Sequence, residues 1–365
     1  MTDTTTIQQA VLLVGGLGTR LRPLTYALPK ALIPVANLPL IAYEIIPLAR
    51  AGVKQIIFAM GYKADLLREH LGDGSDYGTE FVYVEEYERL DTAGAISNVA
   101  DHLDGPFFCC NGDMIYDVDL GAFAQDHLRR EALVTYCLRR TDDISHFGLI
   151  QWQDDGRVTA FKEKVAVDET GRNTVNSGFY LMSPEVLDHI PPGVPYSNET
   201  QLFPDLLSQG LPLYAHVPQR DGYWADVGRF DTYLQANGDV LEGKISWFEP
   251  TGPGSDCRAG ACTPPAVSAT PVRGGVQAPA LQSEGISGSI ADSVDIQPNV
   301  TLGAGCVIGP RVSLGARTRI GDEAFVEDSI IWADSVIGAK AHLTRCIIAG
   351  GTVPEGACLT DEVIV

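Results

Sequence analysis

The sequence has no hydrophobic run long enough to cross a membrane, and its first residues are polar. No apolar stretch approaches the roughly 18 residues that a membrane-spanning helix needs. The opening segment, MTDTTTIQQ, lacks the charged and then apolar pattern of a secretory signal peptide. We therefore expect a cytoplasmic protein.

Cysteines are few and are not spaced as metal ligands. The 365 residues include eight cysteines, and none of them forms a C-x-x-C pair. We expect reduced thiols, including the neighbours Cys109 and Cys110 in an apolar run. For Cys257 and Cys262, which lie in a segment rich in proline and glycine, oxidation or metal binding stays open as an alternative.

Positive charge is also scarce. The chain has 26 Lys and Arg residues against 47 Asp and Glu residues, which gives a formal net charge of −21. So acidic a surface repels phosphates, which argues against nonspecific binding to nucleic acids or anionic membranes. Arg20, Arg22 and Lys30 nevertheless cluster beside a glycine-rich segment. They are either an anion-binding group or ordinary surface cations.

The first 140 residues alternate between short β-rich runs and longer amphipathic ones. This alternation predicts βαβ units, and hence a mostly parallel Rossmann-like sheet with helices on both faces. Ligands bind such sheets beyond the carboxyl ends of the strands, so the glycine loop and residues 111–113 belong on one edge. Strands are expected at 11–14, 55–60, 80–84, 106–110 and 132–138, and helices at 40–52, 64–71, 92–103 and 119–130.

The later part of the chain predicts a domain boundary. After residue 140 the pattern is mixed, with strand-like runs, a helix at 183–190 and another helix after Arg229. A chain of 365 residues is too long for one ordinary core, and we expect the α/β domain to span residues 1–245. Residues 246–285 are rich in proline, glycine, alanine and serine and are interpreted as a linker.

Residues 286–365 carry a repeat with a period of six. The register is followed by Ile296, Leu302, Ile308, Leu314, Ile320, Val326 and Trp332, and it slips by one residue after Trp332. The pattern resembles the hexapeptide repeats of left-handed parallel β-helices, with aliphatic side chains inward. Glycine follows four of these residues, and we expect it to take unusual dihedral angles at the turns. Such a domain is expected to mediate homo-oligomer contacts.

The glycine loop after the first strand predicts a phosphate site. Gly15, Gly16 and Gly18 leave backbone N–H groups accessible to phosphate oxygens, although a tight turn also favours glycine. The loop has neither the G-x-G-x-x-G spacing of a dinucleotide site nor the G-K-[ST] of a Walker loop. It continues into Thr19 and the cations, which favours chemistry on more than one phosphate.

Six blocks of sequence carry a resemblance to a known family. Residues 15–25, with the Pro-Lys pair at 29–30, resemble the signature of sugar-1-phosphate nucleotidylyltransferases. Later blocks of that family are matched in order by 92–95, 111–113, 161–164, 175–178 and 224–228. Several members of the family also carry a C-terminal β-helix.

The resemblance implies a reaction. An oxygen of a sugar 1-phosphate attacks the α-phosphorus of a nucleoside triphosphate, and pyrophosphate leaves. This nucleophile is already anionic, so the barrier is mostly repulsion and positioning, and no general base is needed. The layout is closest to mannose-1-phosphate guanylyltransferases, which favours GTP and mannose 1-phosphate, with UTP or dTTP and glucose 1-phosphate as the alternative. A noncatalytic regulatory homologue and an acyltransferase that uses His342 of the coil also stay open.

The resemblance also implies roles for charged residues. Asp113 and Asp226 are expected to hold Mg²⁺, for which carboxylate oxygens are suitable ligands. Arg20 is expected to bind the β and γ phosphates, and Lys30 to lie near the α-phosphate. Lys164 is expected to bind the sugar phosphate, although the neighbouring Lys162 is an alternative. Turn capping by the aspartates and surface exposure of the cations are the structural alternatives.

The remaining implied contacts involve the sugar and the base. Glu163 and Asn176 are expected to hydrogen-bond sugar hydroxyls, and Gly94 to let the backbone approach base or sugar. Base choice is assigned to Glu85 or its neighbour Glu86. The structural alternatives are a charge at the sheet edge for Glu163, a turn amide for Asn176 and helix packing for Gly94.

The chain departs from the family pattern at Asp91. Family members commonly read Leu-Gly-Thr-Ala-Gly where this chain has Leu-Asp-Thr-Ala-Gly at 90–94. The aspartate either caps the following helix, or alters substrate choice or weakens catalysis.

Overall fold

A computed structural model describes residues 7–61, 63–142, 144, 147–163, 168–220, 222–248 and 289–365. The chain divides into two compact units: the first unit is Met1–Leu17 with Tyr43–Trp224, and the second unit is Gly18–Ala42 with Ala225–Val365. Most of the predicted linker lies outside the described residues. Within those residues, no helix is both long enough and apolar enough to span a bilayer.

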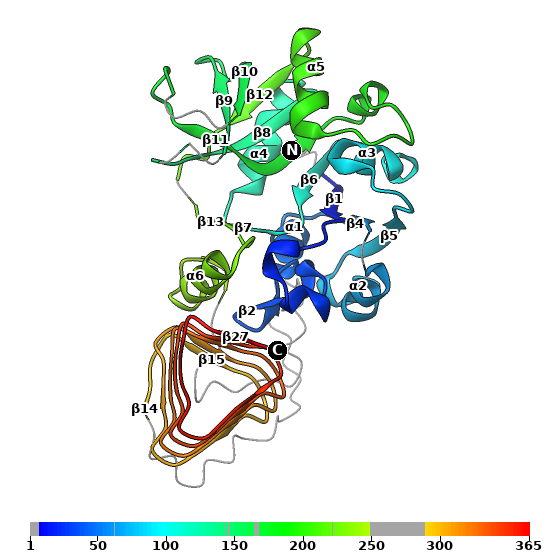
Figure 1. The fold of residues 1–365 in the computed structure, drawn as a ribbon. Coiled ribbons are helices and arrows are strands. Elements are labelled where there is room, and N and C mark those ends of the chain that lie inside the picture. The colour runs from blue at the N-terminus through cyan, green and yellow to red at the C-terminus, as the bar shows by residue number, and fades with distance from the viewer. Residues whose placement is uncertain are drawn as a thin grey trace, which may run out of the picture. The chain divides into compact units, whose positions relative to one another are not determined.

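Four parallel strands form one half of the main sheet in the first unit. The order β6-β1-β4-β5 can be followed in Figure 1, and every pairing within it is parallel. Because β1, β4 and β6 are buried on both faces, their sequences are continuous apolar runs. The bounds are β1 (Gln9–Val14), β4 (Gln55–Met60), β5 (Glu80–Glu85) and β6 (Phe107–Asn111).

The other half of this sheet is antiparallel around β11 (Thr174–Met182). That strand pairs in antiparallel fashion with β6, β8 and β9, so β6 and β8 point the same way. The predicted sheet is therefore confirmed as Rossmann-like, but it is mixed rather than mostly parallel. The other strands of this sheet are β8 (Val134–Arg140), β9 (Gly148–Trp152), β10 (Val158–Glu163) and β12 (Leu213–His216), whereas β7 (Met114–Tyr116) and β13 (Trp224–Asp226) lie outside it.

Helices cover both faces of the sheet. Side chains alternate along β6, so Cys109 packs in the cluster that includes Ile96 of α3, whereas Phe108 lies 6.1 Å from Phe123 of α4. The predicted helix at 183–190 is a 3₁₀ segment, Pro184–His189, which two prolines follow closely. The α-helices are α1 (Ala42–Arg50), α2 (Ala64–Leu71), α3 (Asp91–Asn98), α4 (Leu120–Arg129), α5 (Phe203–Ser208) and α6 (Phe230–Leu241).

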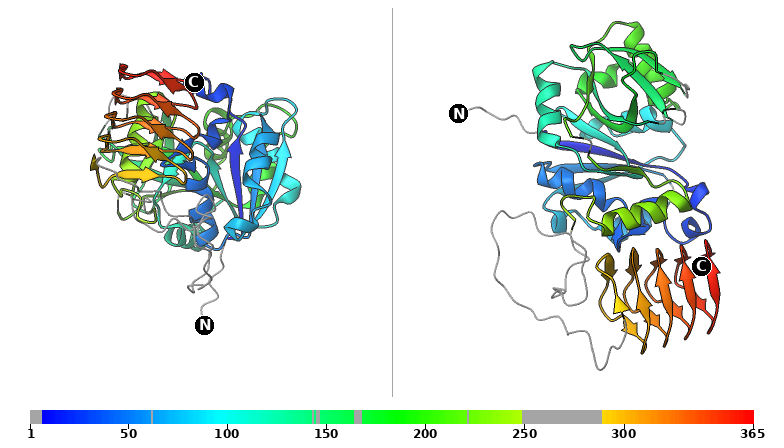
Figure 2. Two further views of the ribbon diagram at one scale, coloured as in Figure 1. Left: turned by 90° about the horizontal axis from the view of Figure 1, so that it is seen from below. Right: turned by 90° about the vertical axis from the view of Figure 1, so that its left-hand side faces the viewer.

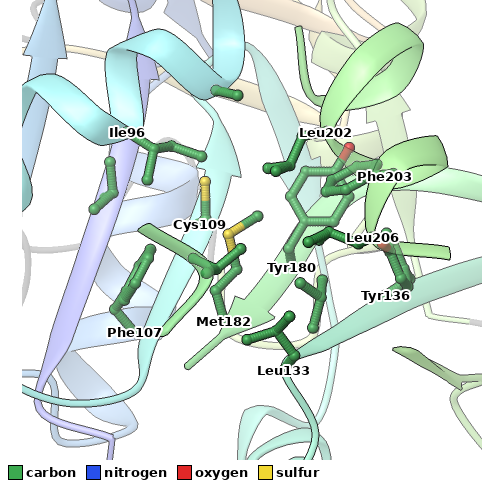
Figure 3. Packing of buried hydrophobic residues seen from close by; sticks show 14 of the residues in the cluster. Ile96, Phe107, Cys109, Leu133, Tyr136, Tyr180, Met182, Leu202, Phe203 and Leu206 are labelled. Atoms are coloured by element: carbon green, nitrogen blue, oxygen red, sulfur yellow. The ribbon is translucent and has the colours of Figure 1, made fainter. Parts of the chain in front are cut away.

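Aromatic packing fixes α5 to the sheet. The ring centre of Phe203 lies 4.8 Å from that of Tyr136 of β8 and 5.1 Å from that of Tyr180 of β11, and both pairs are edge to face. The three residues are labelled in Figure 3. Such pairs are worth about 0.5–1.5 kcal/mol each beyond the area they bury. The π-helical turn Asn198–Leu202, which leads into α5, is thereby held against the same face.

The second unit contains a parallel β-helix at residues 289–365. Its strands form three parallel sheets within that range, and the coil is three-sided in Figure 1 and stacked in Figure 2. The strands are β14 (Ser289–Ile290), β15 (Val294–Ile296), β16 (Thr301–Leu302), β17 (Val307–Ile308), β18 (Val312–Leu314), β19 (Arg319–Ile320), β20 (Phe325–Glu327), β21 (Ile330–Ile331), β22 (Val336–Ile337), β23 (His342–Thr344), β24 (Ile347–Ile348), β25 (Thr352–Val353), β26 (Cys358–Thr360) and β27 (Val363–Ile364).

The inward register differs from the prediction at one residue. Ile331, not Trp332, enters the core of the coil, where it pairs with Leu314. The coil shortens here: Ile308 pairs with Val326 eighteen residues on, whereas Leu314 pairs with Ile331 seventeen residues on. Because the slip occurs before Trp332, the tryptophan side chain lies outside the coil core. Its Nε1 donates a hydrogen bond to the Tyr233 hydroxyl of α6 at 3.1 Å.

The glycines of the repeat are needed for space rather than for unusual dihedrals. A Cβ at Gly303, Gly315 or Gly321 would lie 2.3–2.4 Å from backbone nitrogen of the next coil. Of the four glycines that follow predicted inward residues, only Gly309 has a positive φ. The left-handed corners are occupied mostly by charged residues such as Arg311.

Candidate active site

The glycine loop after β1 contains glycines with different requirements. Gly18 has a φ of +59°, and a Cβ there would lie 2.9 Å from Cγ2 of Thr25, so folding itself requires glycine. The Thr25 hydroxyl donates to the Gly18 carbonyl at 2.9 Å. A Cβ on Gly16, by contrast, would have nothing within 4 Å. The loop therefore has open space beside exposed backbone at Gly16.

The second unit gathers cations around one carboxylate. Thr19 begins a 3₁₀ turn that carries the exposed Arg20. Lys30 begins another such turn, and its Nζ lies 3.7 Å from Oδ1 of Asp226. A Cβ on Gly228 would lie 3.0 Å from both Nη2 of Arg20 and Oδ1 of Asp226. The predicted phosphate-binding residues Arg20 and Lys30 and the predicted metal ligand Asp226 are thus neighbours within this unit.

In the first unit, Asp113 occupies a turn that the sheet holds on two sides. Its backbone N–H donates to the Asn111 carbonyl at 2.7 Å, and Gly112 donates to the Leu13 carbonyl at 3.0 Å. The Asn111 amide packs against Gly178, where a Cβ would lie 2.7 Å from Nδ2 and where φ is +77°. The carboxylate is half-buried at the carboxyl end of β6.

The two neighbouring glutamates have different environments. Glu85 is exposed and pairs with Arg68 at 3.5 Å. Glu86 is half-buried, and its Oε1 lies 3.5 Å from where a Cβ on Gly15 would be. Its Oε2 accepts a hydrogen bond from the Leu90 N–H at 3.3 Å, and burial raises the pKa of the carboxyl group. Glu86, rather than Glu85, therefore adjoins the glycine loop.

The departure at Asp91 does not form the predicted helix cap. Asp91 is the first residue of α3, with a φ of +60°, and its Oδ1 accepts from the N–H of the adjacent Thr92 at 2.9 Å. Capping would need a bond to a residue two or three positions further on. Nearby, Gly94 packs against a loop, and a Cβ there would lie 2.7 Å from the Val194 carbonyl oxygen. Close packing thus explains this glycine.

A hydrogen-bond chain orients Asn176. Its Oδ1 accepts from the Gly178 N–H at 3.0 Å, and its Nδ2 donates to the Tyr180 hydroxyl at 2.8 Å. Tyr180 donates in turn to Oε1 of Glu199 at 3.3 Å, and Oε2 of Glu199 accepts from the Thr92 hydroxyl at 3.3 Å. Burial raises the pKa of Tyr180 well above its usual value, so the hydroxyl keeps its proton.

Sequence reasoning missed Tyr180 and Glu199. Tyr180 follows the matched block at 175–178, but a register shift in β11 between Asn176 and Phe179 sets which face it occupies. Glu199 lies outside every matched block. Residues four apart in a regular strand are about 13 Å apart, so the spacing of Asn176 and Tyr180 did not suggest their contact, which the register shift makes possible.

Several remaining predictions fall at or beyond the edge of the described residues. Glu163 ends β10 opposite Gly148, but its side chain and Lys164 lie outside the described part. The alternative residue, Lys162, lies 3.9 Å from Oε2 of Glu169. Within the described residues, no group of three His, Cys, Asp or Glu side chains could hold a metal ion.

The cysteines and the coil histidine take no part in this arrangement. The described cysteines are free, and Cys257 and Cys262 lie outside the described residues. His342 is exposed on β23 and stacks 4.3 Å from Phe325.

Comparison with known proteins gives two matched regions. Residues 9–243 match the family described as Nucleotidyl transferase, and residues 290–365 match the family described as GMPPB C-terminal domain. A mannose-1-phosphate guanylyltransferase of Mycobacterium tuberculosis is 36% identical over 236 residues, 64% of this chain. The aligned part is 65% of that relative's length, slightly under two thirds.

Other similar proteins differ in the substrates that their names state. A UTP–glucose-1-phosphate uridylyltransferase of Synechocystis is 30% identical over 269 residues, which cover 70% of this chain and 68% of that protein. Among solved structures, a putative glucose-1-phosphate thymidylyltransferase of Bacillus anthracis has a TM-score of 0.56 at 23% identity. That alignment covers 63% of this chain and 94% of the other, and it supports the fold alone.

Proposed function

The chain belongs to the nucleotidyl transferase family, and from this we propose that it converts GTP and mannose 1-phosphate into GDP-mannose and pyrophosphate. A phosphate oxygen of mannose 1-phosphate forms a bond to the α-phosphorus of GTP. The bond from that phosphorus to the bridging oxygen breaks, and pyrophosphate leaves with the electron pair. Because the nucleophile is an anion at neutral pH, the protein's task is to offset repulsion and align the reactants.

The choice of GTP rests on Glu86. Guanine presents two adjacent donors, N1–H and the N2 amino group, and a carboxylate can accept from both. Glu86 has an oxygen beside Gly15, next to the open part of the glycine loop. Similarity to guanylyltransferases supports the same assignment. The Synechocystis relative supports UTP and glucose 1-phosphate as the second candidate.

The cations of the second unit serve the triphosphate in this proposal. Arg20 is exposed and has a long side chain, and it is assigned to bind the β and γ phosphates and steady the leaving pyrophosphate. Lys30, whose ammonium group already faces Asp226, is assigned to the α-phosphate. Gly15, Gly16, Gly18 and Thr19 supply backbone contacts to phosphate.

The proposal assigns Mg²⁺ to Asp113 and Asp226. Both are half-buried carboxylates, which offer the hard oxygen ligands that this ion prefers, and phosphates and water usually complete its shell. When bound, Mg²⁺ would neutralise charge on the triphosphate. Asp113→Asn is expected to abolish turnover and leave the melting temperature unchanged. Near-normal turnover in that variant would remove Asp113 as a ligand.

The sugar contacts are proposed for the first unit. Asn176 has one amide hydrogen left after its bond to Tyr180, and a sugar hydroxyl can accept it. Glu163 and Lys164 keep their predicted roles toward a sugar hydroxyl and the sugar phosphate. Gly94 keeps its predicted role only through backbone, because its Cβ position is filled by the loop at Val194.

One assay tests the proposal. Pyrophosphate release is measured with Mg²⁺ for five nucleoside triphosphates, each with mannose 1-phosphate and with glucose 1-phosphate. We expect the highest kcat/KM for GTP with mannose 1-phosphate. A preference for UTP or dTTP with glucose 1-phosphate would favour the second candidate, and no release with any pair would favour a regulatory homologue. Association of copies through the β-helix and a cytoplasmic location stay predictions, testable by light scattering and fractionation.

A further inference from the structure

Glu199 connects α3 to the strand that carries Asn176. It belongs to the π-helical turn Asn198–Leu202, which leads into α5. Its carboxylate accepts hydrogen bonds from Tyr180 of β11 and from Thr92 of α3. Because β11 runs antiparallel to β6, the first residues of β11 lie at the carboxyl end of β6, where ligands of such sheets bind. Glu199 is thus linked, through one side chain, to the residue that the proposed function places at the sugar.

Three hydroxyl groups donate to the Glu199 carboxylate. Its Oε1 accepts from the hydroxyl of Tyr180 at 3.3 Å, and its Oε2 accepts from those of Thr92 and Ser197, each at 3.3 Å. An ionised carboxylate can only accept hydrogen bonds, so it can receive all three protons at once. The donors come from β11, from α3 and from the residue before the turn, and together they fix the position of the carboxylate.

Each of these hydroxyl oxygens also accepts a hydrogen bond from an N–H group. The three N–H donors are Nδ2 of Asn176 to Tyr180 at 2.8 Å, the Asn198 N–H to Thr92 at 2.7 Å and the Thr200 N–H to Ser197 at 3.3 Å. Because these hydrogens occupy lone pairs of the hydroxyl oxygens, the hydroxyl protons themselves are directed to Glu199. Burial, followed by the charge of Glu199, raises the pKa of Tyr180 well above its usual value, so this hydroxyl keeps its proton.

The chain that includes Asn176 therefore has a single polarity. At one end the Gly178 N–H can only donate, and Oδ1 of Asn176 accepts it at 3.0 Å. At the other end Glu199 can only accept, so Tyr180 donates to it and accepts from Nδ2 of Asn176. A reversed amide would place two donors against each other at Gly178. The orientation of the Asn176 amide is thus fixed before any ligand binds.

We propose that Glu199 is a positioning residue for the sugar 1-phosphate, and that it acts through Tyr180 on the Asn176 amide. The inference rests on the proposed function, in which Asn176 donates to a sugar hydroxyl. Without a group that only accepts at position 199, the Tyr180 hydroxyl loses its fixed direction, and the amide loses the partner that holds it. The negative charge of Glu199 also disfavours phosphate nearby, which favours the orientation in which a sugar hydroxyl faces Asn176.

The test is a double-mutant cycle of Glu199→Gln and Asn176→Ala, with Tyr180→Phe as a second break in the chain. Glutamine keeps the size of the side chain but replaces one acceptor oxygen by a donor group. Glu185→Gln removes the same charge from an exposed position and is the matched control. Calorimetric titration with mannose 1-phosphate and with glucose 1-phosphate measures binding without turnover. Steady-state kinetics with the active pair of substrates gives KM for the sugar phosphate and for the nucleotide separately.

We expect Asn176→Ala, which removes the proposed contact itself, to weaken sugar 1-phosphate binding by about 5- to 50-fold. Glu199→Gln and Tyr180→Phe should each weaken it by about 3- to 20-fold, because they leave the amide in place but free to turn. The double variant should stay within about twofold of Asn176→Ala alone, since the glutamate acts through that amide. The KM for the nucleotide should change less than about threefold, and Glu185→Gln should match the wild type.

Three results overturn the proposal. Unchanged sugar 1-phosphate affinity in folded Glu199→Gln would show that the carboxylate does not position the ligand. Losses that multiply in the double variant would show that Glu199 does not act through Asn176. Equal losses for the sugar phosphate and the nucleotide would indicate general damage to the fold. If Glu199→Gln does not fold, the same cycle with Tyr180→Phe decides.

The result is separable from that of the proposed function. A wild-type protein that releases no pyrophosphate, but binds sugar 1-phosphates with the expected coupling between Glu199 and Asn176, would reject the reaction and support this inference. A wild-type enzyme that turns over, with independent effects of the two variants, would support the reaction and reject the inference. A wild-type protein that binds no sugar 1-phosphate, by titration or by saturation kinetics, would reject both.

Discussion

The ammonium nitrogen of Lys30 lies 3.7 Å from Oδ1 of Asp226. The lysine side chain is 11% exposed and the aspartate side chain 38% exposed, so the pair is partly shielded from water. The carboxylate thus holds the lysine in place before any substrate binds, and lysine flexibility is restricted at the position where the proposal needs a cation. Gly228 keeps the space beside this carboxylate clear.

Lys30→Met is expected to lower kcat by about 10²- to 10³-fold, the usual cost of one preorganised electrostatic contact. The methionine keeps most of the buried stem but removes the charge that offsets the α-phosphate. Lys54→Met, at an exposed position before β4, is the matched control and should stay within twofold of the wild type. Pyrophosphate release checks both. Activity of Lys30→Met within threefold of the wild type would reject the role of Lys30.

Glu86→Gln tests base recognition. The amide offers one acceptor and one donor group where guanine needs two acceptors, so we expect KM for GTP to rise about 10- to 100-fold, in line with about 1–3 kcal/mol for a bidentate base contact. Glu85→Gln removes the same charge one residue away, from a side chain that pairs with Arg68, and should change KM less than threefold. Equal effects of the two variants would show that charge, not position, matters.

Asp91→Gly is expected to stabilise the protein by about 0.5–1 kcal/mol, because a left-handed backbone costs non-glycine residues about 1–2 kcal/mol. The gain is limited because the variant loses the bond from the Thr92 N–H to the Asp91 carboxylate. Asp91→Asn should be close to neutral, and Asp91→Ala should destabilise. Urea denaturation gives the order. A glycine variant less stable than the alanine variant would contradict the observed φ of +60°.

The strands of the first unit were largely predictable, because their cause is local. The run at 55–60 is mostly apolar, includes two β-branched isoleucines and forms β4 at those bounds, while 11–14 lies within β1. The strands β9 and β12 were not predicted, since their pairing depends on distant partners. Trp332 was wrongly placed inward, because the six-residue spacing shows that one residue is lost but not on which side of the tryptophan the loss occurs.

The candidate site divides in the same way. The sequence blocks 111–113 and 175–178 contain Asp113 and Asn176, whose residue types alone suggest metal binding and sugar hydrogen bonding. The choice between Glu85 and Glu86, by contrast, depends on which of two neighbours turns toward Gly15 at the end of β5. Glu199 belongs to the site only through its hydrogen bonds with Tyr180 and Thr92, which come from other elements. Contacts of that kind have no local sequence pattern.

Asn237 of α6 connects the β-helix to the hairpin that follows Lys30. Its buried Oδ1 accepts from the Ala36 N–H at 2.8 Å and from the Ser313 hydroxyl at 3.0 Å. Ala36 lies in the hairpin of β2 (Pro34–Val35) and β3 (Leu38–Pro39). The β-helix therefore contributes to fixing the segment that carries Lys30.

Asn237→Ala should destabilise the protein by about 1–3 kcal/mol, because it leaves the Ala36 N–H buried without its acceptor. If the hairpin positions Lys30, kcat should also fall several-fold at temperatures where the variant is folded. Gln235→Ala, which removes an exposed side chain from the same helix, is the control. A destabilised variant with wild-type kcat would show that the contact supports folding only.

His127 gives the first unit a defined response to acid. The ring is buried, with Nδ1 at 2.8 Å from the Thr135 hydroxyl oxygen and Nε2 at 3.2 Å from that of Ser183. The Ser183 hydroxyl donates to the Ala132 carbonyl, so its oxygen accepts from the Nε2 hydrogen, and Nδ1 accepts from Thr135. Burial lowers the pKa of this histidine to about 4, and the nearby Asp126 offsets only part of that effect.

The sign of the pH effect follows from which state binds the proton. Between an unfolded pKa of about 6.5 and the folded pKa of about 4, the unfolded chain takes up a proton that the folded protein does not. The contribution of His127 to the free energy of unfolding is therefore complete above pH 6.5. It is lost as the pH falls toward 4, by about 3 kcal/mol in total. Urea denaturation at pH 7.5 and pH 4.5 should show a smaller drop for His127→Gln than for the wild type, by about 2–3 kcal/mol. His70→Gln, at an exposed position on α2, is the control and should follow the wild type. Parallel losses in all three proteins would mean that other groups govern acid unfolding.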